Sequence, residues 1–247
     1  AAYRAYDEIG AGYAATRRPD PRSVAQIDDA LAGCESVVNV GAGAGSYEPR
    51  DRRVLAVEPS ETMIRQRPAA APPAVRAAAE RLPLRDRSVD AALAALTAHH
   101  WRDRERGIAE MRRVAARRVV VLTWDPDVCE RFWLVRDYFP CIGELDRPRA
   151  LRPSHLLDAL GDGRVVPGPV PHDCIDGFLG AFWRRPTAYL DPSIRAGISS
   201  FALMSRTDRD RGLHRLATDL EQGTWHRHYE HLQQQHELDV GYRLVIV

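Results

Sequence analysis

A glycine-rich turn directly after a short apolar run constrains the fold of this chain most. Ser36–Val40 is rich in β-branched residues, as buried strands are, and Gly41–Ser46 follows it with glycine at alternate positions. Glycine reaches backbone conformations closed to other residues and has no side chain, so this loop can turn sharply and bring bare backbone against a ligand. A second apolar run, Arg53–Val57, ends at Glu58. The two runs predict adjacent parallel strands whose carboxyl ends share a binding edge.

Strand and helix signals alternate from Val24 to Trp124. Asp20-Pro21 combines an N-cap acceptor with proline at the first helical position, and apolar residues recur at helical spacing as far as Gly33. Three further strands are expected, with a helix before the last of them: strands at Ala74–Ala78, Val89–Leu96 and Arg118–Thr123, and the helix at Glu105–Ala115. This alternation predicts an α/β fold with a doubly wound parallel sheet.

Beyond Trp124 the pattern changes to short helices and loops rich in proline and aromatic residues. An amphipathic helix is expected at Leu213–Leu220, and the apolar run Val240–Val247 is expected to be a strand inside the sheet. We therefore expect an α/β core with an N-terminal lid over residues 1–125 and a mostly helical substrate cap over 126–237. Residues 238–247 would return to the core sheet as its last strand.

Charge, cysteine content and hydropathy exclude several classes of function. The 35 basic residues are all arginine and are interleaved with 34 acidic ones, so lysine chemistry is impossible and a one-sided basic surface for nucleic acid is not expected. The four cysteines form no Cys-x-x-Cys motif, which predicts a reduced, cytoplasmic protein. No apolar run approaches the roughly 20 residues of a membrane-spanning helix. His228 and His231 share a helix face, but no third ligand completes a site, so no metal is expected.

The residues around the glycine loop distinguish between adenosine cofactors. Ser46 stands where the dinucleotide fingerprint has glycine, and Glu58 follows Gly41 by seventeen residues instead of about twenty. Pro49 leaves little room for the helix whose N-terminus would bind a pyrophosphate. A carboxylate at Glu58 can still accept hydrogen bonds from both ribose hydroxyls. The loop therefore favours an adenosine cofactor without phosphate.

The region from Tyr3 to Trp124 resembles the class I S-adenosylmethionine-dependent methyltransferases, in the branch of small-molecule and natural-product tailoring enzymes. Five motifs in order carry the resemblance: Val38–Gly45, Val57–Ser60 with Met63, Ala79–Leu84 with Asp90, His99–Trp101, and Glu110–Val114. It implies that the sheet is the Rossmann-like sheet of these enzymes. It also implies S-adenosyl-L-methionine as the cofactor and S-adenosyl-L-homocysteine as its product.

The resemblance assigns roles to the first two strand ends. It implies that Gly41, Gly43 and Gly45 lie along the methionine moiety and that Glu58 binds the ribose.

It further implies that Pro59 and Met63 lie beside the adenine and that Ala79 and Glu80 flank its edge. Many relatives have an aspartate where this chain has Ala78, so adenine recognition is expected to depend on backbone groups and on Glu80.

Four more residues are candidates from the two segments expected to close the site. In the N-terminal segment, Tyr13 and Arg18 are expected near the carboxylate of the cofactor. His99 and His100 follow the strand ending near Leu96, where an acceptor would meet the methyl group, and either imidazole could act as the base because it titrates near neutrality.

The predicted function is transfer of the sulfonium methyl group to an oxygen, nitrogen or carbon atom of a small-molecule acceptor. Three alternatives are a pericyclase-like protein that binds the cofactor without methylating, an NAD(P)-dependent oxidoreductase, and an RNA-methylating enzyme. The balanced charge opposes the last. The acceptor and the oligomeric state are open. Five aromatic residues could line an apolar pocket or form the core of the cap: Trp101, Trp124, Trp133, Tyr138 and Trp183.

Overall fold

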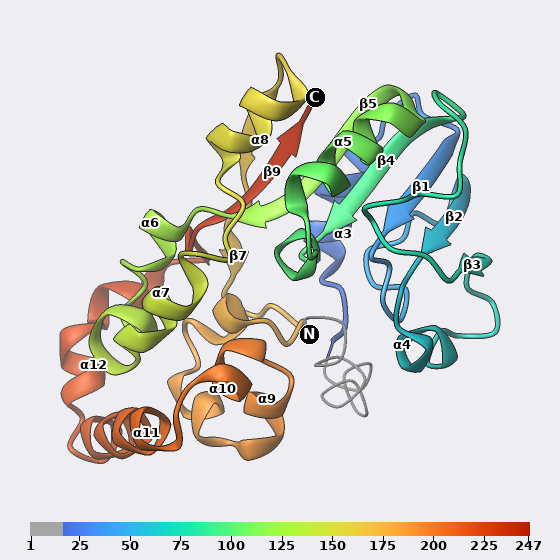
Figure 1. Cartoon of the computed structure of the whole chain (residues 1–247). Coiled ribbons are helices and arrows are strands. Elements are labelled where there is room, and N and C mark those ends of the chain that lie inside the picture. Colours follow the sequence, from blue (N-terminus) through green and yellow to red (C-terminus); the bar gives the residue numbers. More distant parts are fainter. Residues whose placement is uncertain (1–16) are drawn as a thin grey trace.

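The strand signals of the sequence form one seven-stranded sheet in the order β3-β2-β1-β4-β5-β9-β6 (Figure 1). The computed structural model describes residues 17–247. The strands are β1 Ser36–Val40, β2 Arg53–Val57, β3 Ala74–Val75, β4 Val89–Ala95, β5 Ala115–Trp124, β6 Arg164–Pro167 and β9 Tyr242–Ile246. β1 to β5 run parallel, and β9 lies antiparallel between β5 and β6. The doubly wound α/β prediction is confirmed.

The α-helices around the sheet are α3 Pro21–Ala30, α4 Glu61–Arg65, α5 Arg104–Val114 and α8 Pro153–Leu160. Of these, α3, α4 and α5 begin at capping side chains, and α8 begins at a proline. Asp20 accepts a hydrogen bond from the backbone N–H of Arg22, and Pro21 occupies the first helical position, as expected. α3 packs with Val37, Leu93 and Val120 on one face of the sheet. α5 and α8 cover the other face, where Met111 and Leu156 are fully buried.

The second lobe consists of short helices that gather beside the carboxyl edge of the sheet (Figure 1). Its α-helices are α6 Pro126–Cys129, α7 Pro140–Asp146, α9 Pro192–Ala196, α10 Ser199–Leu203, α11 Arg206–Glu221 and α12 Thr224–His228. Tighter or wider turns lie at η2 Leu134–Tyr138, η3 Leu179–Phe182, η4 Pro186–Leu190 and η5 Glu230–Gln234, and the strands β7 Val170–Pro171 and β8 Glu237–Leu238 pair with each other. None of the helices between residues 17 and 247 has the length and apolarity needed to cross a membrane.

Aromatic side chains form the core of this lobe. Trp133, Trp183, Tyr189 and Trp225 are almost completely buried, and Trp133 meets Trp225 edge to face with ring centroids 5.2 Å apart. The indole N–H groups of Trp133 and Trp183 donate to backbone carbonyls, which satisfies their polar atoms inside the core. Of the aromatic residues left open above, Trp133, Tyr138 and Trp183 therefore belong to the lobe core.

The structure does not divide the sheet domain from the second lobe at the expected boundary, residue 125. The range 126–237, expected to be only a cap, also contributes α8 and β6 to the sheet domain. β6 was missed because it is a four-residue edge strand between glycine and proline, and it pairs only with β9. β3 is shorter than the expected Ala74–Ala78, and β5 starts at Ala115, ahead of the expected Arg118.

A buried carboxylate joins the two lobes. Asp176 is 1% exposed and lies between Cys174 and Phe178, which pack in the lobe core. Its Oδ1 accepts from Arg17 Nε at 2.8 Å, and its Oδ2 accepts from the hydroxyl of Tyr47, next to the glycine loop. Gly177 N–H also donates to Oδ1. This cluster therefore ties the N-terminal segment and the glycine loop to the second lobe.

We predict that Asp176→Asn lowers the free energy of unfolding by about 3–5 kcal/mol, because it removes the buried negative charge that pairs with the Arg17 guanidinium. Urea denaturation measures the change. Asp173→Asn is the matched control, since Asp173 pairs with Arg22 at the exposed surface and such a pair contributes about 1 kcal/mol or less. Equal effects from the two substitutions would contradict a structural role for Asp176.

Candidate functional site

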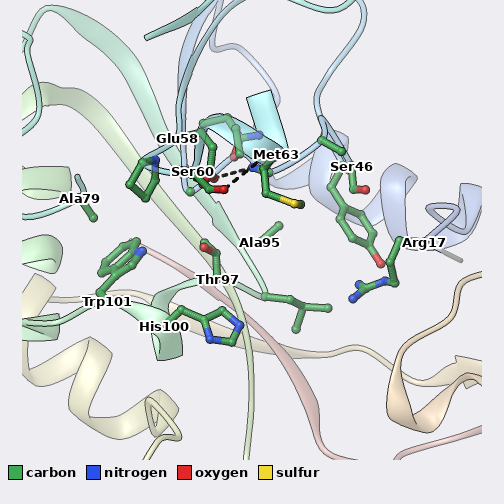
Figure 2. Close-up of a pocket in the computed structure, with 18 residues that line it drawn as sticks. Arg17, Ser46, Glu58, Ser60, Met63, Ala79, Ala95, Thr97, His100 and Trp101 are labelled. Atoms are coloured by element: carbon green, nitrogen blue, oxygen red, sulfur yellow. Dashed lines mark hydrogen bonds between the residues drawn. The ribbon is translucent and has the colours of Figure 1, made fainter. Parts of the chain in front are cut away.

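A cavity of about 800 Å³ opens at the carboxyl ends of β1, β2 and β4. Its walls come from the glycine loop, from the residues after β2 and from the turn after β4. Figure 2 shows Glu58, Ser60 and Met63 gathered at one side of the cavity and His100 and Trp101 at another. The cavity therefore lies at the edge where the sequence predicts a ligand, outside the carboxyl ends of parallel strands.

The glycine loop approaches Thr97 so closely that a side chain would not fit. Gly41 has φ +71°, and a Cβ at this position would lie 2.1 Å from the Oγ1 of Thr97. Gly41 and Gly43 line the cavity, whereas Gly45 faces Glu48 and Arg67 behind the loop. The loop continues as turns without a helix, as Pro49 predicts. Bare backbone therefore forms one wall of the cavity.

A buried ion pair supports this loop from behind. Glu48 accepts from Arg67 Nη2 at 2.9 Å, and both side chains are 5% exposed. Asn39 Nδ2 donates to the other carboxylate oxygen of Glu48 at 3.2 Å. Arg67 Nη1 also reaches the carbonyl of Gly43. These bonds hold the loop in one position against the sheet.

Glu58 is buried at the end of β2 and lines the cavity. Its Oε2 accepts from Gly43 N–H at 2.8 Å, and its Oε1 accepts from Ser60 N–H at 2.9 Å. Ser60 in turn caps α4 by accepting from Met63 N–H, which brings Met63 to the cavity wall. The carboxylate is therefore fixed between the glycine loop and the start of α4.

The other predicted cofactor residues are only partly at the cavity. Pro59 and Ala79 line it. Glu80 does not: its Oε1 accepts from the N–H groups of Arg102 and Asp103, ahead of α5, because its side chain turns toward that loop. Arg18 is exposed, and the neighbouring Arg17 lines the cavity in its place.

Tyr13 lies outside the described residues. The sequence alone does not show which of the adjacent arginines at positions 17 and 18 faces the cavity. The salt bridge to Asp176 identifies Arg17 as that residue.

A second cavity of about 650 Å³ adjoins the first and shares Arg17, Leu96 and His100 with it. Most of its wall is apolar and comes from both lobes, with the aromatic residues Trp124, Phe178 and Tyr242. His99, Asp146 and Ser200 add polar groups. Sequence reasoning missed Asp146 and Tyr242, because they come from a helix end and a strand end that are distant in the chain.

The two histidines follow β4 in the turn η1, Ala98–His100, with Leu96 in the left-handed region at φ +52°. His99 meets Trp124 edge to face with ring centroids 4.6 Å apart. Burial lowers the pKa of His100 to about 3 and holds the pKa of His99 well below its usual range, with a further contribution from the charge of Arg149. Both imidazoles are therefore neutral at physiological pH.

The environment of His100 also bears on where its proton lies. Arg149 Nη2 lies 3.4 Å from Nδ1 of His100. A guanidinium can only donate, so this contact favours the tautomer in which Nδ1 accepts and Nε2 carries the proton. With that tautomer His100 presents a donor at Nε2, and the base role expected of His99 or His100 stays a prediction.

Other polar residues that could be considered as catalytic groups make hydrogen bonds outside the two cavities or are poor nucleophiles. Asp125 caps α6, and the hydroxyl of Tyr138 donates to Asp219 within the second lobe. Within residues 17–247, no group of three or more histidine, cysteine or acidic side chains is arranged to hold a metal ion. Burial raises the pKa of Cys129, at the second cavity, to about 12, so its thiol is a poor nucleophile.

Comparisons with known proteins agree with this geometry. Residues 38–122 match the model of a methyltransferase domain family. A comparison with curated proteins finds no match. Among solved structures, a protein of Anabaena variabilis described as a methyltransferase of an antibiotic biosynthesis pathway is 36% identical, with a TM-score of 0.86. The match covers 94% of this chain and 98% of the Anabaena protein.

Two further solved structures are more distant. A methyltransferase of Thermotoga maritima is 23% identical over 66% of this chain and 77% of its own, with a TM-score of 0.47. One of Aquifex aeolicus is 21% identical over 60% of this chain and 82% of its own, with a TM-score of 0.44. The glycine loop, the buried glutamate after β2 and the match over nearly the whole Anabaena protein lead to one conclusion: the chain belongs to the class I S-adenosylmethionine-dependent methyltransferases.

Proposed function

We propose that this protein transfers the methyl group of S-adenosylmethionine to a small organic acceptor, with the cofactor in the first cavity and the acceptor in the second. We refer to the first as the cofactor cavity and to the second as the acceptor chamber. The observation that carries this proposal is the junction of the two cavities, where Arg17, Leu96 and His100 line both. A reacting pair held on either side of such a junction is aligned, and alignment can contribute about 7–11 kcal/mol to lowering a barrier.

The residues of the first cavity fit the cofactor. The Gly41 turn leaves backbone where a Cβ would collide with Thr97, which allows an extended chain such as the methionine moiety to lie close to it. Glu58 presents a buried carboxylate that can accept hydrogen bonds from ribose hydroxyls. Pro59, Met63 and Ala79 provide apolar contacts for a flat ring. Arg17 takes the role expected of Arg18, near the carboxylate of the cofactor.

The chain itself supplies positioning and exclusion of water. When bound, the cofactor supplies an electrophilic methyl group on a sulfonium. Leu96 at the junction and Trp124 in the acceptor chamber provide apolar walls, which would limit water and orient the acceptor toward the junction. His99 remains the candidate to receive a proton from the acceptor, and His100 holds a proton on Nε2 that can orient an acceptor oxygen or nitrogen.

Cofactor binding tests the first half of the proposal. S-adenosylhomocysteine at a hundred times its dissociation constant should add about 2.7 kcal/mol to stability and raise the melting temperature by several degrees, while NAD and NADP should not. Glu58→Gln should weaken this binding by about 10- to 100-fold, since a hydrogen bond to a charged group contributes about 1.5–3 kcal/mol. Glu80→Gln is the matched control, because Glu80 faces the loop before α5. Stabilisation by NAD instead would contradict the assignment.

Methyl transfer tests the second half. Protein incubated with methyl-labelled S-adenosylmethionine and a cell extract should move the label into products of low molecular mass. Gly41→Val should abolish the transfer, because its side chain would displace Thr97 or the loop. Label found only in RNA or protein would overturn the small-molecule acceptor. Cofactor binding without any transfer would favour the non-methylating alternative.

The neutral state of His100 predicts a loss of stability in acid. Its folded pKa of about 3 lies below the unfolded value, so stability is full above about pH 6.5 and falls as the unfolded chain takes up a proton. At pH 5 this loss amounts to about 2 kcal/mol. Urea midpoints at pH 7 and pH 5 measure it. His100→Gln should show a smaller loss than the wild type, whereas His155→Gln, on the exposed side of α8, should match the wild type. Identical pH dependence in the two variants would show that His100 is not the buried neutral group.

A further inference from the structure

The acceptor chamber contains one acidic side chain among its described lining residues, Asp146 at the end of α7. The side chain is 14% exposed. Its Oδ2 accepts from the hydroxyl of Ser200 at 3.1 Å, and Arg149 Nη1 lies 3.4 Å from its Oδ1. A strong arginine–carboxylate pair makes two parallel bonds of about 2.7–2.9 Å, and this single long contact is weaker. Asp146 is therefore a largely buried carboxylate with partial compensation from protein.

The other charged side chains at the chamber do not neutralise the negative charge of Asp146 any further. Arg17, the basic residue of the lining, is paired with Asp176 at 2.8 Å. Arg149 divides its contacts between Asp146 and His100, each at 3.4 Å. Burial raises the pKa of Asp146 in spite of Arg149 and Ser200, which shows that these contacts do not offset the loss of water. A cation in the chamber would complete the electrostatic environment of this carboxylate.

The aromatic residues of the chamber favour the same kind of ligand. Phe178 and Tyr242 meet edge to face with centroids 4.7 Å apart, and Trp124 adds a third ring. Aromatic faces attract organic cations and pack against flat rings. The indole N–H of Trp124 is also buried without a hydrogen-bond partner. Within residues 17–247 the indole N–H of Trp225 in the lobe core is unpaired as well, so the aromatic walls, rather than this donor, indicate the class of ligand.

We propose that Asp146 binds a protonated amino group of the acceptor, so that the chamber selects compact, ring-containing amines. This inference rests on the proposed function. Asp146 lines the acceptor chamber but not the cofactor cavity, whereas Arg17, Leu96 and His100 line both. We assign the amino group bound by Asp146 as an anchor apart from the transferred methyl group, so that Asp146 determines specificity while His99, which also lines only the chamber, remains the candidate base.

Four probes of one shape test this inference: 2-naphthylmethylamine, 2-naphthylmethanol, 2-methylnaphthalene and 2-naphthoate. Calorimetry at pH 7 measures their affinity for protein saturated with S-adenosylhomocysteine. The amine should bind at least tenfold more tightly than the alcohol, and the carboxylate should bind most weakly. Asp146→Asn should abolish the preference for the amine over the alcohol. Asp158→Asn, the same change at an exposed position of α8, should keep it.

Equal binding of amine and alcohol to the wild type would overturn the inference, as would an amine preference that survives Asp146→Asn. Asp146→Glu keeps the negative charge and should keep the preference, which provides a second test if the asparagine variant does not fold. Failure of the proposed function has a different signature, because the wild type would then either not bind S-adenosylhomocysteine or bind it without transferring the methyl label.

Discussion

The buried carboxylate of Asp176 is the interaction on which the geometry of both cavities depends. It fixes the guanidinium of Arg17 at the junction and holds Tyr47 at the end of the glycine loop. Because Asp176 belongs to a segment packed into the second lobe, these three side chains link the position of that lobe to the end of the glycine loop. A disturbance in either lobe would therefore reach the junction directly.

The two cavities differ in which segments of the chain line them and in the side chains that these segments bring. The first cavity is made from the glycine loop, the residues after β2 and the turn after β4, with Arg17 beside them, and its backbone turns and Glu58 are held by hydrogen bonds. The acceptor chamber is assembled from residues far apart in the chain, with aromatic walls, neutral imidazoles and one acid. Under the proposed function the first cavity holds the cofactor. The second can change its ligand by substitutions in the second lobe that leave the sheet intact.

The sequence predicted those parts of the fold whose signals are local. β1, β2 and α3 follow from β-branched runs, a glycine turn and an Asp-Pro cap, and the structure has each of them. β6 could not be predicted, because it is held only by pairing with a strand almost eighty residues further along. The same limit applies to the site. Glu58 follows from its place after a strand, whereas Arg17 and Asp146 are distinguished only by three-dimensional contacts with Asp176, Ser200 and Arg149.

The placement of β9 between β5 and β6 has a consequence for how the protein acquires its structure. β5 ends at Trp124 and β9 begins at Tyr242, so the apolar edge of β5 has no partner until the second lobe has been synthesised. Pairing across such a sequence separation is slow, and an exposed strand edge is a template for aggregation. The run Val119–Leu122 is therefore prone to aggregate during synthesis. Arg117 and Arg118 directly before it place positive charge beside that edge, which opposes aggregation. The yield of folded protein would then depend on chaperones and temperature during expression more than on the stability of the finished sheet.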